Sequence, residues 1–406
     1  MSGTQILRTR VGVLTLPVRL SWRDPGWWLT AQILVVTVFS LFWNPLDFSI
    51  YRLGGSAVRS GTDLYLERQA GLFFTYTPFA ALSFTPLSWI PLVPSRLLWE
   101  LATVAAFALA CREMLLLARL SRLRPGWVVV GGLMLEPVWH TLFLGQINVF
   151  LLALVLFDVR RVAGGTGLGV GVGIGVAAAI KLTPGIFIVL LLCAGKVRAA
   201  VTAAVTFVAC TGLGVVAAPG ASRLYWSKVF FDTSRVGASY ISNQSPFGAL
   251  VRLLGGRENV GSWYLVVPLV LLTYGLVLAT RRARSGDWAA AVAVGGLTSL
   301  VVSPISWSHH WVWALPALVV LVRDGRHRVA LAAGAVLALS PMWWLPRDLP
   351  VDWLTANAYL VMGLALLGLL GVSGERAGDV LPLRRSGTIV RSGTFSRRCF
   401  EPKSGV

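Results

Sequence analysis

Long apolar runs separated by short polar connections fill most of this chain. A helix needs about 20 mostly apolar residues to cross the hydrocarbon core of a bilayer. Such runs predict spanning helices, some of them short enough to be half-helices, at 27–43, 97–118, 127–143, 147–158, 166–180, 184–195, 198–218, 262–280, 288–304, 309–322, 328–345 and 354–372. The stretch 76–93 is also apolar but contains three prolines, so it predicts either a kinked span or a re-entrant segment.

The pattern predicts an all-α polytopic membrane protein with a bundle of about 11 to 13 transmembrane helices. The long connections 44–75 and 219–261 mix aromatic, basic and polar residues, which is typical of short helices in the outer membrane interface. We expect residues 27–372 to form the membrane domain. Residues 1–26 then form a cytoplasmic N-terminal segment, and 373–406, rich in Arg, Ser and Gly, a disordered basic cytoplasmic tail.

Composition supports a bilayer as the solvent. Of 406 residues, 56% are hydrophobic and 13% are charged, against roughly 25% charged in soluble domains. A soluble enzyme, a disordered chain and a disulfide scaffold are therefore excluded. The net charge of +19 predicts cytoplasmic loops beside anionic membrane lipid rather than a nucleic-acid partner. The four cysteines follow no metal or redox spacing, so no metal site is expected.

Charge also predicts the topology. Basic residues gather at 119–124, 160–161, 196–198, 281–284 and 323–328. With about twelve crossings and both ends cytoplasmic, all these clusters lie inside, as the positive-inside rule prefers. The other connections then meet at one extracytoplasmic face of the plasma membrane, and they carry polar clusters at 44–52, 145–148, 181–184, 243–246 and 303–310.

A glycine-rich stretch at 164–175 contains Gly167, Gly171 and Gly175 at small-xxx-small spacing. This spacing favours close packing of helices in a membrane. A nucleotide-binding loop is the weaker interpretation, because no strand–turn–helix unit surrounds the glycines.

Two carboxylates stand out. Asp47 directly follows the first span, where it can act as a general base on a hydroxyl; the alternative is a helix cap or an ion pair with Arg52. Glu136 lies inside an apolar run, where a carboxylate is costly and indicates function. His140 is four residues on, so a structural pair that locks helices together is the alternative.

Lys181 ends an apolar helix just before Thr183 and Pro184, so it can hold a phosphate at a helix break or merely reach the interface as a snorkelling lysine. His309 and His310 can donate to a phosphate or orient a base. Adjacent helical positions diverge by about 100°, so we expect one of the two to face the site. The neutral amides suit sugar hydroxyls and helix caps equally well; they are Gln146, Asn148, Asn243 and Gln244.

In these segments the sequence resembles the family-87 glycosyltransferases of actinobacteria. The resemblance covers about residues 44–316 and depends on ordered motifs: LDFSIY at 46–51, FTYTPFAAL at 74–82, EPV at 136–138, GQIN at 145–148, AAIKLTP at 178–184, NQS at 243–245 and SPISWSHHW at 303–311. The sequence departs from the family at Thr77, where proline is more usual, and at His140, where arginine is usual.

The resemblance implies a GT-C fold and an inverting mannosyl transfer without nucleotide, metal or other cofactor. The donor would be a β-linked polyprenyl-phosphate mannose, the acceptor a phosphatidylinositol mannoside or another glycolipid or lipoglycan, and the product an α-mannoside, commonly α-1,2. The resemblance makes Asp47 the general base. From the charge, chemistry and predicted sidedness of the other polar residues, we expect His309 and His310 to be catalytic as well. The expected substrate-binding residues are Arg52, Tyr76, Glu136, Gln146, Asn148, Lys181, Asn243 and Gln244.

Two alternatives remain at this point. A transporter or flippase for a lipid-linked sugar would also have many helices broken near polar residues, although no internal repeat is evident. An enzyme of the same fold could use another polyprenyl-phosphate sugar, such as arabinofuranose.

Overall fold

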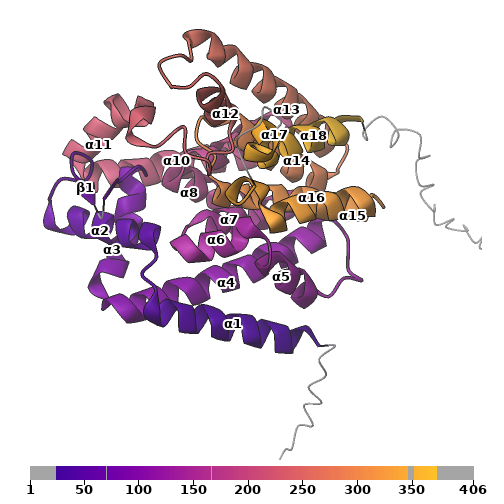
Figure 1. The fold of residues 1–406 in the computed structure, drawn as a ribbon, viewed down its shortest axis with the longest axis horizontal. Coiled ribbons are helices and arrows are strands. Elements are labelled where there is room, and N and C mark those ends of the chain that lie inside the picture. Colours follow the sequence, from indigo (N-terminus) through magenta and orange to yellow (C-terminus); the bar gives the residue numbers. More distant parts are fainter. Residues whose placement is uncertain (1–23, 70, 166, 346–351, 373–406) are drawn as a thin grey trace, which may run out of the picture.

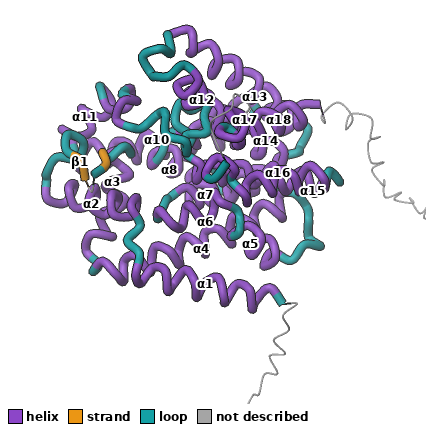
Figure 2. The backbone as a smooth tube through the Cα atoms, viewed as in Figure 1, coloured by secondary structure: helices purple, strands orange, loops and turns teal. Residues whose placement is uncertain are grey.

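The computed structural model describes residues 24–69, 71–165, 167–345 and 352–372. The predicted tail 373–406 and nearly all of the predicted N-terminal segment 1–26 lie outside these residues. Within them the regular elements are helices apart from one antiparallel pair of short strands, β1 (Arg68–Gln69) and β2 (Leu72–Phe73), and loops join them (Figure 2). This architecture confirms the predicted all-α membrane fold.

The first half of the chain forms nine α-helices: α1 (Pro25–Phe42), α2 (Leu46–Ser60), α3 (Pro78–Trp89), α4 (Leu92–Leu117), α5 (Pro125–Leu133), α6 (Glu136–Leu144), α7 (Asn148–Ala163), α8 (Val172–Ile180) and α9 (Ile186–Cys193). The second half forms α10 (Val197–Ala217), α11 (Pro219–Ser227), α12 (Pro246–Leu253), α13 (Val266–Arg284), α14 (Trp288–Val302), α15 (Leu315–Arg323), α16 (His327–Leu339), α17 (Asp352–Ala356) and α18 (Ala358–Val372). Short 3₁₀ turns link several of them: η1 (Thr183–Gly185), η2 (Val229–Phe231), η3 (Thr233–Arg235), η4 (Ser262–Leu265), η5 (Ser308–Ala314) and η6 (Pro341–Trp343).

Fewer helices than expected are uninterrupted spans. Among the described residues, α1, α10 and the continuous η4–α13 helix are long and apolar enough to cross a membrane alone. A fourth span results if α5 and α6, which are bent by 70° at a short break, count as one. The other predicted spans are divided by helix breaks, carry charges, as α4 does, or are shorter than 18 residues, as α14 is with 15. The α3 helix has 12 residues, about 18 Å, which is too short to cross, so the stretch 76–93 is not one continuous span.

The helices differ in how deeply they lie in the bundle. α14 is the central helix, because every residue from Trp288 to Val301 is buried. A helix that is apolar on all sides belongs in such a core. In contrast, only 6% of α1 is buried, so α1 is a peripheral helix whose apolar surface faces outward. Figure 1 shows α2, α3, β1 and α11 at one end of the molecule and α5 and α15 toward the other.

Of the three glycines at small-xxx-small spacing, Gly171 and Gly175 pack closely against another helix as predicted, and Gly167 does not. A Cβ on Gly171 would lie 2.3 Å from the backbone oxygen of Ala199, and a Cβ on Gly175 would lie 2.5 Å from that of Ala203. Both contacts join α8 to α10 at a distance that only glycine allows. Gly167 lies outside α8 and next to Arg161, so it takes no part in this contact.

We predict that Gly175→Ala destabilises the protein by roughly 1–3 kcal/mol, because the added methyl group would force α8 away from α10. The matched control is Gly212→Ala in α10, where an added Cβ meets nothing within 4 Å. Thermal unfolding of the two purified variants in the same detergent would test this. Equal melting temperatures would contradict the close helix contact.

Candidate active site

The candidate site forms where four interruptions of the helical chain meet. Asp47 lies in the first turn of α2, and Gln146 lies in the turn between α6 and α7. Lys181 ends α8 in an extended conformation, and His310 lies in η5. Helix ends leave backbone groups and side chains free to converge, so these breaks bring together polar residues far apart in the sequence.

Asp47 is a half-buried carboxylate with several polar neighbours. Burial raises its pKa to about 6, although a hydrogen bond from Gln146 and the charges of Lys181 and His140 favour the ionised form. Asp47 caps no helix end, since Pro45 is the N-cap residue of α2. The carboxylate is therefore ionised at neutral pH and still more basic than an exposed aspartate.

A triangle of oxygen atoms lies beside Asp47. The hydroxyl oxygens of Tyr51 and Tyr76 are 2.8 Å apart, and each lies 2.8 Å from Gln146 Oε1. This network occupies the Gln146 carbonyl and leaves its amide group to donate to Asp47. The preceding residue, Gly145, has a φ of 69°, and a Cβ there would lie 2.6 Å from Phe48. Only glycine allows the turn that presents Gln146.

Lys181 is held as a half-buried ammonium. Its Nζ donates to Asn148 Oδ1 at 2.9 Å and lies 2.8 Å from His310 Nε2, and it sits 5.4 Å from the centre of the Tyr76 ring. Burial lowers its pKa to about 7, and the Asp47 charge opposes this shift. An ammonium has three donors, so two hydrogen bonds leave one N–H available for a ligand. The snorkelling alternative does not fit a lysine held by partners on two other elements.

His309 is buried next to Lys181 and His310 but, unlike them, makes no side-chain hydrogen bond within the described part of the chain. Both of its ring nitrogens lack a hydrogen-bond partner among the described residues. Its ring centre lies 4.8 Å from that of His310 and 5.4 Å from that of His140. A buried imidazole without partners is unfavourable unless something binds it, so His309 is a candidate ligand contact. Both histidines of the pair thus lie at the site, where the sequence predicted one.

Glu136 has no exposed surface and four hydrogen-bond donors. His140 Nδ1, Ser308 Oγ and Trp343 Nε1 lie 2.8, 2.7 and 3.1 Å from its Oε1, and the Tyr359 hydroxyl lies 2.9 Å from its Oε2. These donors come from α6, η5, η6 and α18. Glu136 is fully enclosed in this way, so its carboxylate holds the histidine segment η5 in position and does not reach substrate. We therefore assign Glu136 a structural role, the locking of helices, rather than substrate binding.

Three further predicted substrate contacts also have structural partners. Arg52 donates to the carbonyls of Leu87 and Ile90, and it makes no ion pair with Asp47. Asn243 and Gln244 are completely buried, and their side chains bond to backbone groups of the loop 304–306 and of residues 356–359. Because these groups are already satisfied, we assign all three residues to the framework around the site.

Several residues of the site escaped the sequence analysis. Tyr51 lies one helical turn after Asp47, and this i,i+4 spacing was a usable signal. Ser308 belonged to the predicted polar cluster 303–310 but received no role of its own. Trp343 and Tyr359 carried no local signal, because their importance comes from meeting Glu136 across the bundle. The described residues contain no group of three or more His, Cys, Asp or Glu side chains that could hold a metal ion.

The arrangement places a carboxylate base and a half-buried cation in one polar cluster within an apolar bundle. Residues 74–304 match glycosyltransferase family 87. The chain belongs to this family. It is therefore an enzyme that transfers a glycosyl group, and the transporter alternative is not supported.

Similar proteins cover most of the chain. A Mycobacterium tuberculosis protein named polyprenol-phosphate-mannose-dependent alpha-(1-2)-phosphatidylinositol mannoside mannosyltransferase is 33% identical over 389 residues, which covers 86% of this chain and 90% of that protein. The protein of the same name from Mycolicibacterium smegmatis is 32% identical, covering 82% of this chain and 86% of its own length. A second M. tuberculosis protein, named as the corresponding pentamannoside mannosyltransferase, is 32% identical, covering 84% of each chain. No solved structure matches this family-87 chain.

We predict that Glu136→Gln lowers the free energy of unfolding by about 1–3 kcal/mol, because an amide group would replace a carboxylate oxygen and face a buried donor. The matched control is Glu67→Gln, at an exposed position. Thermal unfolding followed by tryptophan fluorescence would compare the two variants. If both unfold like the parent protein, the four-donor arrangement around Glu136 does not stabilise the fold.

Proposed function

We propose that this enzyme transfers mannose from a polyprenol-phosphate mannose to a phosphatidylinositol mannoside, with formation of an α-(1→2) linkage. The names of the three relatives support both substrates and favour mannose over arabinofuranose. The observation that carries the proposal is the pairing of Asp47 with Lys181 in one cluster within a glycosyltransferase family. A base for the acceptor and a cation for the leaving phosphate are what such a transfer needs.

Asp47 acts as the general base. The acceptor hydroxyl oxygen attacks C1 of the mannose and passes its proton to the Asp47 carboxylate. The bond between C1 and the phosphate oxygen breaks, and its electron pair leaves with polyprenyl phosphate. Attack from the face opposite the phosphate converts a β-linked donor into an α-mannoside. Gln146 orients the carboxylate through its hydrogen bond.

Lys181, Asn148 and the two histidines form the phosphate side of the site. The remaining N–H of Lys181 supplies a positive charge as the phosphate departs. His309, with both ring nitrogens free of partners in the described residues, donates to a phosphate oxygen or a sugar hydroxyl. Tyr76 lies between the two sides, since its hydroxyl contacts Gln146 and its ring faces Lys181.

The site faces the outer side of the plasma membrane. Its orientation follows from α7, which begins with Asn148 beside Lys181 and has Arg160 and Arg161 in its last turn. The positive-inside rule places the arginine end in the cytoplasm and so leaves the lysine end outside.

Replacing Asp47 with asparagine keeps the shape of the side chain but removes the base. We predict that Asp47→Asn lowers turnover by about 10²–10⁴-fold, the range usual for a lost general base, with no loss of folded protein. Purified protein given radiolabelled polyprenyl-phosphate mannose and a phosphatidylinositol mannoside would report the elongated glycolipid. Asp63→Asn, at an exposed carboxylate near the end of α2, is the matched control and should remain active. Turnover of Asp47→Asn close to the parent value would show that another group is the base.

The pH dependence follows from the same two residues. Asp47 works ionised with a pKa of about 6, and Lys181 works protonated with a pKa of about 7. We therefore predict that kcat/KM rises as the pH increases through the pKa of Asp47 and falls as it increases through the pKa of Lys181. Bound phosphate favours the ammonium, so the alkaline limb of kcat should lie at a higher pH than that of kcat/KM.

The variant Lys181→Arg stays protonated throughout this range and should lose the alkaline limb. Rates measured between pH 5 and 9 (roughly the window that these pKa values set) would separate the two limbs. An alkaline limb that persists unchanged in Lys181→Arg would assign it to a different group.

A further inference from the structure

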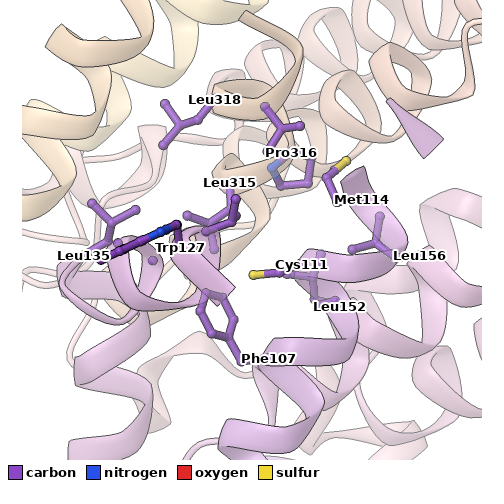
Figure 3. A pocket seen from close by; sticks show the side chains of 15 residues that line it. Phe107, Cys111, Met114, Trp127, Leu135, Leu152, Leu156, Leu315, Pro316 and Leu318 are labelled. Atoms are coloured by element: carbon purple, nitrogen blue, oxygen red, sulfur yellow. The ribbon is translucent and has the colours of Figure 1, made fainter. Parts of the chain in front are cut away.

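A second cavity lies outside the candidate active site. It has a volume of about 200 Å³ and is lined by side chains of α4, α5, α7 and α15 (Figure 3). Phe107, Cys111 and Met114 from α4 face Leu315 and Leu318 from α15 across it. All of its lining residues are apolar. A lining without polar partners for water favours an apolar ligand.

The cavity is open at its side. Trp127 and Gly131 of α5 line it and are exposed, whereas Phe107 and Leu152 at its inner wall are buried. The exposed surface of α5 belongs to the apolar exterior of the bundle. An apolar chain in the surrounding bilayer can therefore enter between α5 and α15 without crossing polar groups.

One end of the cavity lies next to a basic loop. Met114 is three residues before the end of α4, and Trp127 is in the first turn of α5. Arg119, Arg122 and Arg124 lie between these helices and are exposed. None of the three takes part in an ion pair within the described part of the chain, and the loop 118–124 holds no acidic residue. Tryptophan and arginine at this position are typical of the level of lipid headgroups.

The arginine loop and the candidate active site lie at opposite ends of α4. Trp99 donates to the carbonyl of Gly145 beside that site, and Met114 is 15 positions further along α4. That separation is about 22 Å along the helix axis. A ligand whose charged group binds Lys181 thus leaves the arginine loop without a partner. A ligand whose charged group binds the arginine loop and whose apolar chain enters the cavity accounts for both the loop and the cavity.

We propose that this cavity binds an acyl chain of an anionic phospholipid, whose phosphate contacts Arg122 and Arg124. The lipid belongs to the leaflet on the arginine side and is separate from both substrates of the transfer. The apolar walls take the chain and the basic loop selects the charge of the headgroup. This proposal is independent of the roles assigned to Asp47 and Lys181.

Photocrosslinking tests the proposal on the full chain in nanodiscs. Two probes carry the same diazirine-labelled acyl chain, one on phosphatidylglycerol and one on phosphatidylcholine. After irradiation, mass spectrometry compares adducts on the peptide containing Cys111 and Met114 with adducts on α10. We expect phosphatidylglycerol to label the cavity peptide more strongly, by about fivefold for each arginine in contact.

Two pairs of variants separate the cavity from general lipid contact. Gly131→Phe fills the cavity, since a Cβ at Gly131 meets nothing within 4 Å, and it should abolish the labelling; Gly212→Phe, in equally open space on α10, should not. Arg122→Gln with Arg124→Gln should reduce labelling by phosphatidylglycerol to the phosphatidylcholine level, whereas the exposed Arg198→Gln should leave it unchanged.

Three results would overturn the proposal. Labelling of Gly131→Phe at the parent level would place the probe outside the cavity. Equal labelling by the two headgroups would remove the role of the arginines. Displacement of the phosphatidylglycerol probe by unlabelled polyprenyl phosphate would assign the cavity to the lipid chain of the sugar donor.

Discussion

The enclosure of Glu136 is the constraint on which the rest of the site depends. A carboxylate transferred from water into a protein interior loses several kcal/mol of solvation unless donors replace the water. Here four donors from separate parts of the chain do so. Ser308 belongs to this set and directly precedes His309 and His310, so satisfying the carboxylate also fixes where the two imidazoles lie. The need to solvate the buried Glu136 carboxylate thus determines where the His309 and His310 imidazoles can act.

A second consequence is the difference between two kinds of buried polar group. Glu136, Asn243 and Gln244 have bonding partners throughout and form a rigid frame. Lys181 and His309 keep unused hydrogen-bonding capacity. Unused capacity in a low-dielectric interior is unfavourable in the free protein and becomes favourable when a charged or polar ligand binds. The pattern of satisfied and unsatisfied groups, more than their chemical type, separates framework from site.

The molecule also divides its polar groups between two ends. Asp47, Gln146 and Lys181 gather where helices are interrupted, whereas clusters of arginines lie at or just beyond the opposite ends of α4, α7 and α15. The apolar helices between them prevent the two groups of charges from meeting. The catalytic cluster thus lies at one end of the bundle, and the apolar cavity lies along the helices between the two groups of charges.

The sequence by itself determined the class of fold, the positions of most helices and the residues that carry charge into the site. Apolar runs and their interruptions are local properties, and Asp47, Lys181 and the histidine pair stand out because charge is rare in such a chain. Only the tertiary structure decided which spans are broken, that Arg52, Asn243 and Gln244 bond to the framework, and that Trp343 and Tyr359 take part. Side-chain hydrogen bonds between different helices join residues that are tens to hundreds of positions apart, so their pairing depends on packing and leaves no periodic signal along the chain.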